Sequence, residues 1–75
     1  MKSEEKMFFI FCIALNRFGF NVRKAVDILD KYIPRKRLWY YLDKWSNLGF
    51  YDYGVTLDLG WFYIDKLPAR YKELL

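Results

Sequence analysis

The stretch from Ile33 to Tyr51, IPRKRLWYYLDKWSNLGFY, constrains the fold most, because it contains both ends of one amphipathic helix. Proline is favoured in the first turn of a helix, so the helix is predicted to begin near Pro34. Gly49 suits the left-handed residue that ends a helix, and Phe50 occupies the hydrophobic position of a Schellman motif. The sequence therefore predicts one helix over residues 34–48.

This helix has one apolar face and one polar face. The apolar positions, spaced by three or four residues, are Leu38, Tyr41, Leu42, Trp45 and Leu48. The outward positions are Arg35, Lys36, Arg37, Trp39, Tyr40, Asp43, Lys44 and Asn47. Cations in the first turn oppose the helix macrodipole, at a cost of some tenths of a kcal/mol each. That cost indicates a use for the positive charge beyond folding.

Two shorter helical patterns come first. A helix capped by Ser3 is predicted to run to about residue 18, where Gly19 repeats the glycine stop. Asn21 is predicted to cap a second helix over about residues 22–31. A link of three or four residues then leads into the helix at 34, which is a helix-turn-helix arrangement.

The first of these helices carries two apolar stripes, although a surface helix needs only one. The main stripe comprises Met7, Phe8, Phe11, Ala14, Leu15 and Phe18. The second stripe comprises Phe9, Ile10 and Ile13. The second stripe has three candidate covers: the C-terminal segment, the hairpin or another copy of the chain. Its residues are therefore candidates for a dimer or partner interface.

After Gly49 the pattern changes to that of strands. Residues 50–57 and 61–64 are rich in aromatic and branched side chains, and Asp58-Leu59-Gly60 suits a three-residue hairpin loop. In the expected register Tyr53 lies opposite Asp65, Val55 opposite Tyr63 and Leu57 opposite Trp61. Pro68 is predicted to open a last short helix over residues 69–75.

The order of these elements resembles a winged helix. The segment from Ile33 to Phe50 is similar to the recognition helix of winged helix-turn-helix regulators, which have the pattern I-S-x-x-T-V-x-x-x-L-x-x-L-x-x-x-G-L; the apolar positions and the glycine match. The resemblance covers about residues 21–64. It implies an α+β winged helix in one domain, residues 1–75: a three-helix bundle with a helix-turn-helix, a β-hairpin wing and a short C-terminal helix. Small size and aromatic content also resemble small proteins of Gram-positive phages and mobile elements.

The charge distribution supports a nucleic-acid partner. Between Asn21 and Lys44 there are seven cations and three anions, whereas the six cations elsewhere are balanced by six anions. The resemblance implies sequence-specific binding of double-stranded DNA in a transcriptional or mobile-element regulator, with the helix over 34–48 in the major groove. The residues expected to contact DNA are Arg35, Lys36, Arg37, Tyr40, Lys44, Arg23 and Lys24. The simpler interpretation is a solvated basic face.

The oligomeric state follows from the small size of such a reading head. A single recognition helix reads only a few base pairs, so a homodimer is expected, with half-sites about one helical turn apart. About six phosphate contacts predict a log-log salt slope near −5.

Two features favour a different partner. From Gly49 to Asp65 every charged residue is an aspartate, which DNA phosphates repel, and Trp39 is bulky for a position that faces a groove. The alternative function is therefore a protein-binding adaptor or inhibitor that uses the acidic aromatic hairpin and Trp39. The simpler interpretation of the hairpin aromatics is that they form the core of a small domain.

Catalysis finds little support in the sequence. The chain has no histidine and a single cysteine, Cys12, within an apolar helix, so a Cys/His zinc site, a disulfide and a histidine-activated nucleophile are excluded. We expect no enzyme activity, no cofactor, no metal and no small-molecule substrate. The apolar run over residues 7–15 is too short to cross a bilayer and lacks a signal-peptide pattern, so we expect no membrane association and a cytoplasmic protein.

Overall fold

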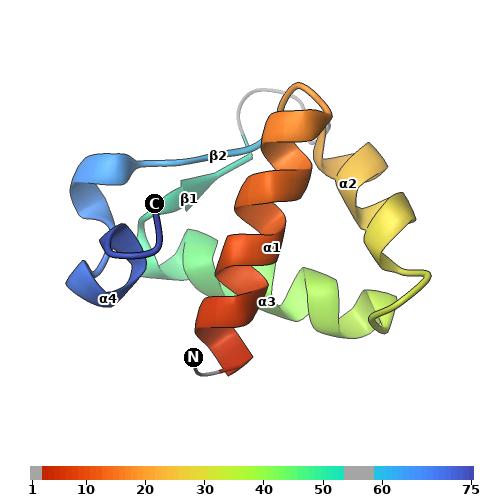
Figure 1. Ribbon diagram of the computed structural model, residues 1–75, viewed down its shortest axis with the longest axis horizontal. Helices are drawn as coiled ribbons and strands as arrows, with labels where there is room; N and C mark the ends of the chain where they lie inside the picture. Colours follow the sequence, from red (N-terminus) through yellow and green to blue (C-terminus); the bar gives the residue numbers. More distant parts are fainter. Residues whose placement is uncertain (1–2, 54–58) are drawn as a thin grey trace.

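The computed structural model describes residues 3–53 and 59–75, and the chain forms a small α+β arrangement (Figure 1). The elements are α1 (Ser3–Arg17), α2 (Val22–Leu29), α3 (Arg35–Leu48), β1 (Tyr51–Asp52), β2 (Trp61–Phe62), the 3-10 helix η1 (Ile64–Lys66) and α4 (Ala69–Lys72). In Figure 1, α1 crosses α3, with α2 on one side of the crossing and the hairpin and α4 on the other. This order is compatible with a winged helix, but it is not specific to that fold.

The predicted bounds of α3 are confirmed. Pro34 is the N-cap residue and the helix ends at Leu48. Gly49 adopts the left-handed conformation, with a φ of 91°. The backbone N–H of Phe50 donates to the carbonyl of Trp45 at 3.3 Å, as in a Schellman motif. The local signals at the two ends of the segment therefore suffice to define the helix.

The end of α1 uses the same device, while its start differs from the prediction. Gly19 has a φ of 62°, and the N–H of Phe20 donates to the carbonyl of Leu15 at 2.7 Å. Ser3 is already helical, so it is not the N-cap that the sequence predicted. Among the described residues, none of the helices is both long and apolar enough to cross a bilayer.

The second helix is shorter than predicted. Asn21 is its N-cap, because its side chain accepts a hydrogen bond from the N–H of Lys24 at 2.9 Å. The helix ends at Leu29, two residues before the predicted end. The N–H groups of Tyr32 and Ile33 both donate to the Leu29 carbonyl, at 3.0 and 2.9 Å, and this turns the chain toward α3.

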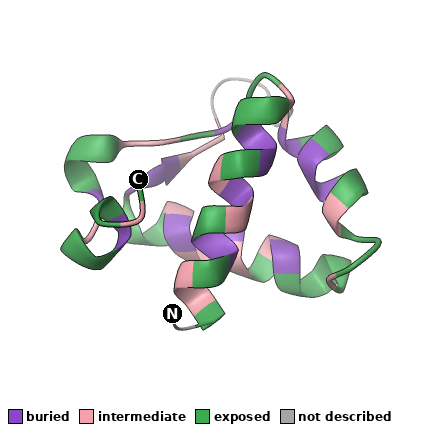
Figure 2. Cartoon of the chain, in the orientation of Figure 1, coloured by how far each residue is buried: buried purple, intermediate pink, exposed green. Residues whose placement is uncertain are grey.

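The core lies where α1, α3 and the hairpin meet, and Figure 2 shows buried positions on the inward faces of the helices. Trp45 is fully buried at its centre. Its ring lies 6.1 Å from that of Phe8, 5.8 Å from that of Phe11 and 5.6 Å from that of Phe62, all three edge-on. Edge-to-face packing of this kind adds to the energy of burial, so aromatic side chains hold the three parts together.

The predicted hairpin register is wrong. The two short strands pair antiparallel, with Tyr51 opposite Phe62 and Asp52 opposite Trp61. The predicted pairings of Val55 and Leu57 fall on residues outside the described part of the chain. Strand β1 begins at Tyr51 rather than Phe50, and β2 ends before Ile64, which begins η1.

A long-range contact explains this register. A Cβ atom at Gly60 would overlap the hydroxyl of Tyr51 and the side chain of Val22. The N–H of Gly60 donates to the carbonyl of Phe20 at 2.9 Å, and Leu59 forms an isolated bridge with Asn21. The chain before β2 is therefore attached to the turn between α1 and α2, which fixes where β2 meets β1.

The C-terminal helix is a single turn. Pro68 is its N-cap as predicted, but the helix ends at Lys72 rather than at residue 75. Tyr71 is fully buried, and its ring stacks on that of Phe8 at 4.6 Å. This contact fastens α4 to the first helix.

Candidate nucleic-acid interface

The face of α3 turned away from the core forms an exposed ridge. Its members follow one another at spacings of four, three and four residues, opposite the buried positions of the helix. The ridge comprises Lys36, Tyr40, Asp43 and Asn47. Shallow hollows flank it, one lined by Lys36, Arg37 and Tyr40, and another lined by Tyr40, Asp43 and Asn47. The structure therefore presents one continuous polar surface along the helix.

Lys36 and Arg37 are available to an external anion. Both are exposed in the first turn of α3. Among the described residues, no carboxylate forms an ion pair with either of them. These two cations, predicted to contact DNA, are thus directed to solvent beside Tyr40, which is 59% exposed.

Arg35 is engaged differently from its two neighbours. Its guanidinium lies 2.9 Å from a carboxylate oxygen of Asp27 and 2.8 Å from one of Asp30, both contributed by the preceding helix and its end. Hydrogen bonds to Asp27 and then Asp30 raise the pKa of Arg35 above its ordinary value. Arg35 therefore braces the turn between α2 and α3, a role that the sequence analysis missed because it assigned both aspartates to solvation.

Lys44 is also held by the protein itself. Its ammonium lies 3.0 Å from the carboxylate of Glu4, which is also 3.7 Å from the guanidinium of Arg70. Burial alone raises the pKa of Glu4, but the hydrogen bond and positive charge of Lys44 outweigh it, so the net pKa is lowered. Lys44 therefore ties α3 to α1 and lies close to the C-terminal helix.

The other two predicted contacts lie at the start of α2. Arg23 and Lys24 are exposed in its first turn, where Asn21 caps the helix. Their position on the helix that precedes the recognition segment suits phosphate contacts rather than base contacts.

Trp39 takes part in the contact between α3 and the hairpin. Its indole is half-buried and stacks on Tyr53 with ring centres 6.2 Å apart. The hydroxyl of Tyr53 donates to the carboxylate of Asp43 at 3.1 Å. Tyr51 is buried as core, whereas Trp61 remains 36% exposed, so the hairpin aromatics divide between core and surface.

The second stripe of α1 is only partly covered. Phe9 and Ile13 are 38% and 54% exposed, and Ile10 is half-buried. Cys12, beside them, is half-buried, and burial raises the pKa of its thiol to about 12. Its thiol therefore stays protonated and unreactive near neutral pH.

Two residues of the ridge were not among the predicted contacts. Asp43 and Asn47 continue the helical spacing that starts at Lys36, and this periodicity was the available signal. An asparagine amide can bind the edge of adenine, and a carboxylate can accept from the amino group of cytosine. Among the described residues, no cluster of three side chains is suited to bind a metal ion.

Comparisons with known proteins add no assignment. No protein-family model, curated protein or solved structure matches this chain. Its function is therefore argued from its own residues and geometry.

Proposed function

We propose that this chain is a winged helix-turn-helix protein that binds double-stranded DNA in a sequence-specific manner through the ridge of α3. Its biological role would be that of a small transcriptional or mobile-element regulator. The observation that supports the proposal best is the state of Lys36 and Arg37, two exposed cations that form no ion pair among the described residues. They lie at the end of the helix that this fold directs into the major groove.

The ridge offers a suitable set of side chains for reading bases. Arg37 can bind guanine in a bidentate manner, and Lys36 can bind either guanine or a phosphate. Further along the helix, Asn47 supplies an amide for adenine and Asp43 an acceptor for cytosine. Donors and acceptors on one helical face are what discrimination between base pairs requires.

The cations held within the protein have a supporting role in this proposal. The contacts of Arg35 with Asp27 and Asp30 join the two helices of the helix-turn-helix at 2.8 to 2.9 Å. They favour one orientation of α3 before DNA arrives, which reduces the ordering cost on binding. Lys24, on α2, is assigned to a phosphate.

The described part of the hairpin contributes no positive charge. Residues 51–53 and 59–63 contain one charged side chain, Asp52, whose carboxylate accepts a hydrogen bond from the Tyr63 hydroxyl. In this proposal the helix binds the DNA and the hairpin supports it through Tyr53. The same lack of cations favours the alternative, a protein-binding adaptor that uses the hairpin surface. Affinity capture from a nuclease-treated lysate separates the two, since an adaptor keeps its partner there.

The proposal is tested by measuring affinity for a mixed-sequence duplex by fluorescence anisotropy over a series of salt concentrations. Lys24, Lys36 and Arg37 supply three phosphate-contacting cations per subunit and six per dimer, so the log-log slope should be roughly −5. Lys36→Ala/Arg37→Ala removes four contacts per dimer and should reduce the slope to roughly −2.

The matched control is Lys66→Ala/Lys72→Ala, which removes the same charge from exposed positions outside the helix-turn-helix. It should leave the slope close to that of the wild type. A flat salt response of the wild type, or equal losses of affinity in the two double variants, would contradict binding through α3.

A further inference from the structure

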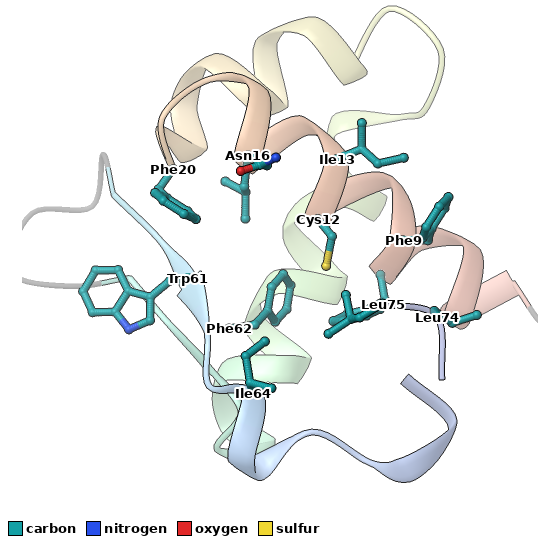
Figure 3. Close-up of a pocket in the computed structure, with 12 residues that line it drawn as sticks. Phe9, Cys12, Ile13, Asn16, Phe20, Trp61, Phe62, Ile64, Leu74 and Leu75 are labelled. Atoms are coloured by element: carbon teal, nitrogen blue, oxygen red, sulfur yellow. The ribbon is translucent and has the colours of Figure 1, made fainter. Parts of the chain in front are cut away.

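An open apolar groove lies between α1 and the segment formed by β2, η1 and the C-terminal residues (Figure 3). Its volume is about 650 Å³. Six large apolar side chains along it are 36–61% exposed: Phe9, Ile13, Phe20, Trp61, Ile64 and Leu75. Figure 3 shows that they come from both sides of the groove, with Cys12 and Phe62 between them. The groove therefore leaves the second stripe of α1 without a cover from the described part of the chain.

The exposed area of this groove is large enough for a stable interface. A large apolar side chain presents roughly 200 Å², so these six leave roughly 600 Å² open in each copy. Two copies together would bury roughly 1,200 Å², the lower limit of specific protein interfaces. A monomer of this size rarely exposes so much apolar surface in one continuous patch.

The outward face of α1 is complementary to itself. If two copies of α1 pair antiparallel about a two-fold axis at residue 11, Phe9 lies opposite Ile13 of the second copy. The same pairing places Glu5, near the start of the helix, opposite Arg17 at the end of the other helix. Each contact then occurs twice, as in an isologous interface. Apolar side chains meet at the centre, and opposite charges meet at both ends.

We propose that a second copy of this chain covers the groove, forming a two-fold dimer through antiparallel α1 helices. Among the described residues that line the groove, none belongs to α3. Dimer formation therefore leaves the ridge of both copies exposed, and the proposed DNA binding can occur on the assembled dimer. The dimer itself is independent of DNA and can be tested without it.

The test is sedimentation equilibrium over low to high micromolar protein. The wild type should show twice the 9.2 kDa mass of the chain. Ile13→Glu places a charge at the centre of the interface and should weaken the dimer about 30-fold or more. The matched control is Ile28→Glu, at a 39% exposed position on α2 outside the groove, which should remain a dimer. Circular dichroism checks that both variants are folded.

A charge-reversal series tests the antiparallel arrangement. Glu5→Arg and Arg17→Glu should each weaken the dimer, and the two changes together should restore most of the affinity, since opposite charges again meet. A wild type that is monomeric at every concentration would overturn the proposal, whether or not it takes up an apolar dye or another protein. Equal dissociation by Ile13→Glu and Ile28→Glu would also overturn it.

Discussion

The guanidinium of Arg35, the first residue of α3, lies 2.8 Å from the carboxylate of Asp30, the residue that ends α2. Asp27 contacts the same guanidinium at 2.9 Å. The first turn of α3 therefore divides its cations between two tasks. Arg35 fixes the helix-turn-helix from within, while Lys36 and Arg37 remain directed outward.

This division predicts an unusual effect of removing acidic residues. Asp27→Asn/Asp30→Asn should lower the thermal midpoint, because the brace across the turn is lost. It should also raise the affinity for duplex DNA several-fold and steepen the salt slope by about one per subunit, because Arg35 becomes free to contact a phosphate. Differential scanning fluorimetry and anisotropy measure the two effects.

The control for this pair is Asp65→Asn/Glu73→Gln, which makes the same change of charge at exposed positions outside the helix-turn-helix. It should leave the thermal midpoint and the salt slope nearly unchanged. Identical gains in DNA affinity from both double variants would show that only net charge matters.

The carboxylate of Glu4 predicts a dependence of stability on pH. Its pKa in the folded protein is below the ordinary value of 4.5, mainly because Lys44 opposes the effect of burial. The carboxylate therefore stabilises the fold above that ordinary value, and this contribution is lost as the pH falls through the folded pKa. Glu4→Gln should lower the free energy of unfolding by about 1 kcal/mol at neutral pH and by less at pH 3.

Urea unfolding of the wild type and Glu4→Gln at both pH values measures this difference. Glu73→Gln, at an exposed position of the C-terminal segment, is the control and should change stability little at either pH. A gap between wild type and Glu4→Gln that persists unchanged at pH 3 would indicate that the loss comes from packing rather than charge.

Gly60 predicts a steric effect that sequence pattern alone does not suggest. Gly60→Ala forces a methyl group against the Tyr51 hydroxyl and Val22, and should lower the free energy of unfolding by about 2 kcal/mol. Gly49→Ala meets no atom within 4 Å, so only its φ of 91° opposes the change, at about 1 kcal/mol. Urea unfolding compares the two variants. If Gly60→Ala were the milder change, our explanation of the hairpin register would be wrong.

The features predicted from sequence are those fixed by neighbouring residues. The bounds of α3 depend on Pro34 and Gly49, and both act within one turn of the helix. The hairpin register could not be obtained in this way, because it depends on Gly60 packing against Tyr51 and Val22, a residue of another helix. A contact between residues this far apart in the chain leaves no periodic signal.

The candidate site shows the same limit. The exposure of Lys36 and Arg37 followed from helical periodicity, but the capture of Arg35 depends on how the turn after α2 orients two helices. Lys44 was predicted to contact DNA, and its pairing with Glu4 of α1 required the packing of distant elements. Charge counts indicated the right segment without separating internal contacts from available ones.

The most direct test of the central claim is an NMR titration of the protein with a mixed-sequence DNA duplex, recorded on backbone amides. DNA binding through α3 predicts shift changes concentrated at Lys24, Lys36, Arg37, Tyr40 and Asn47, with little change at the groove residues Phe9, Ile13 and Trp61. Changes confined to the groove or hairpin, or no change at α3 under saturating duplex, would contradict it.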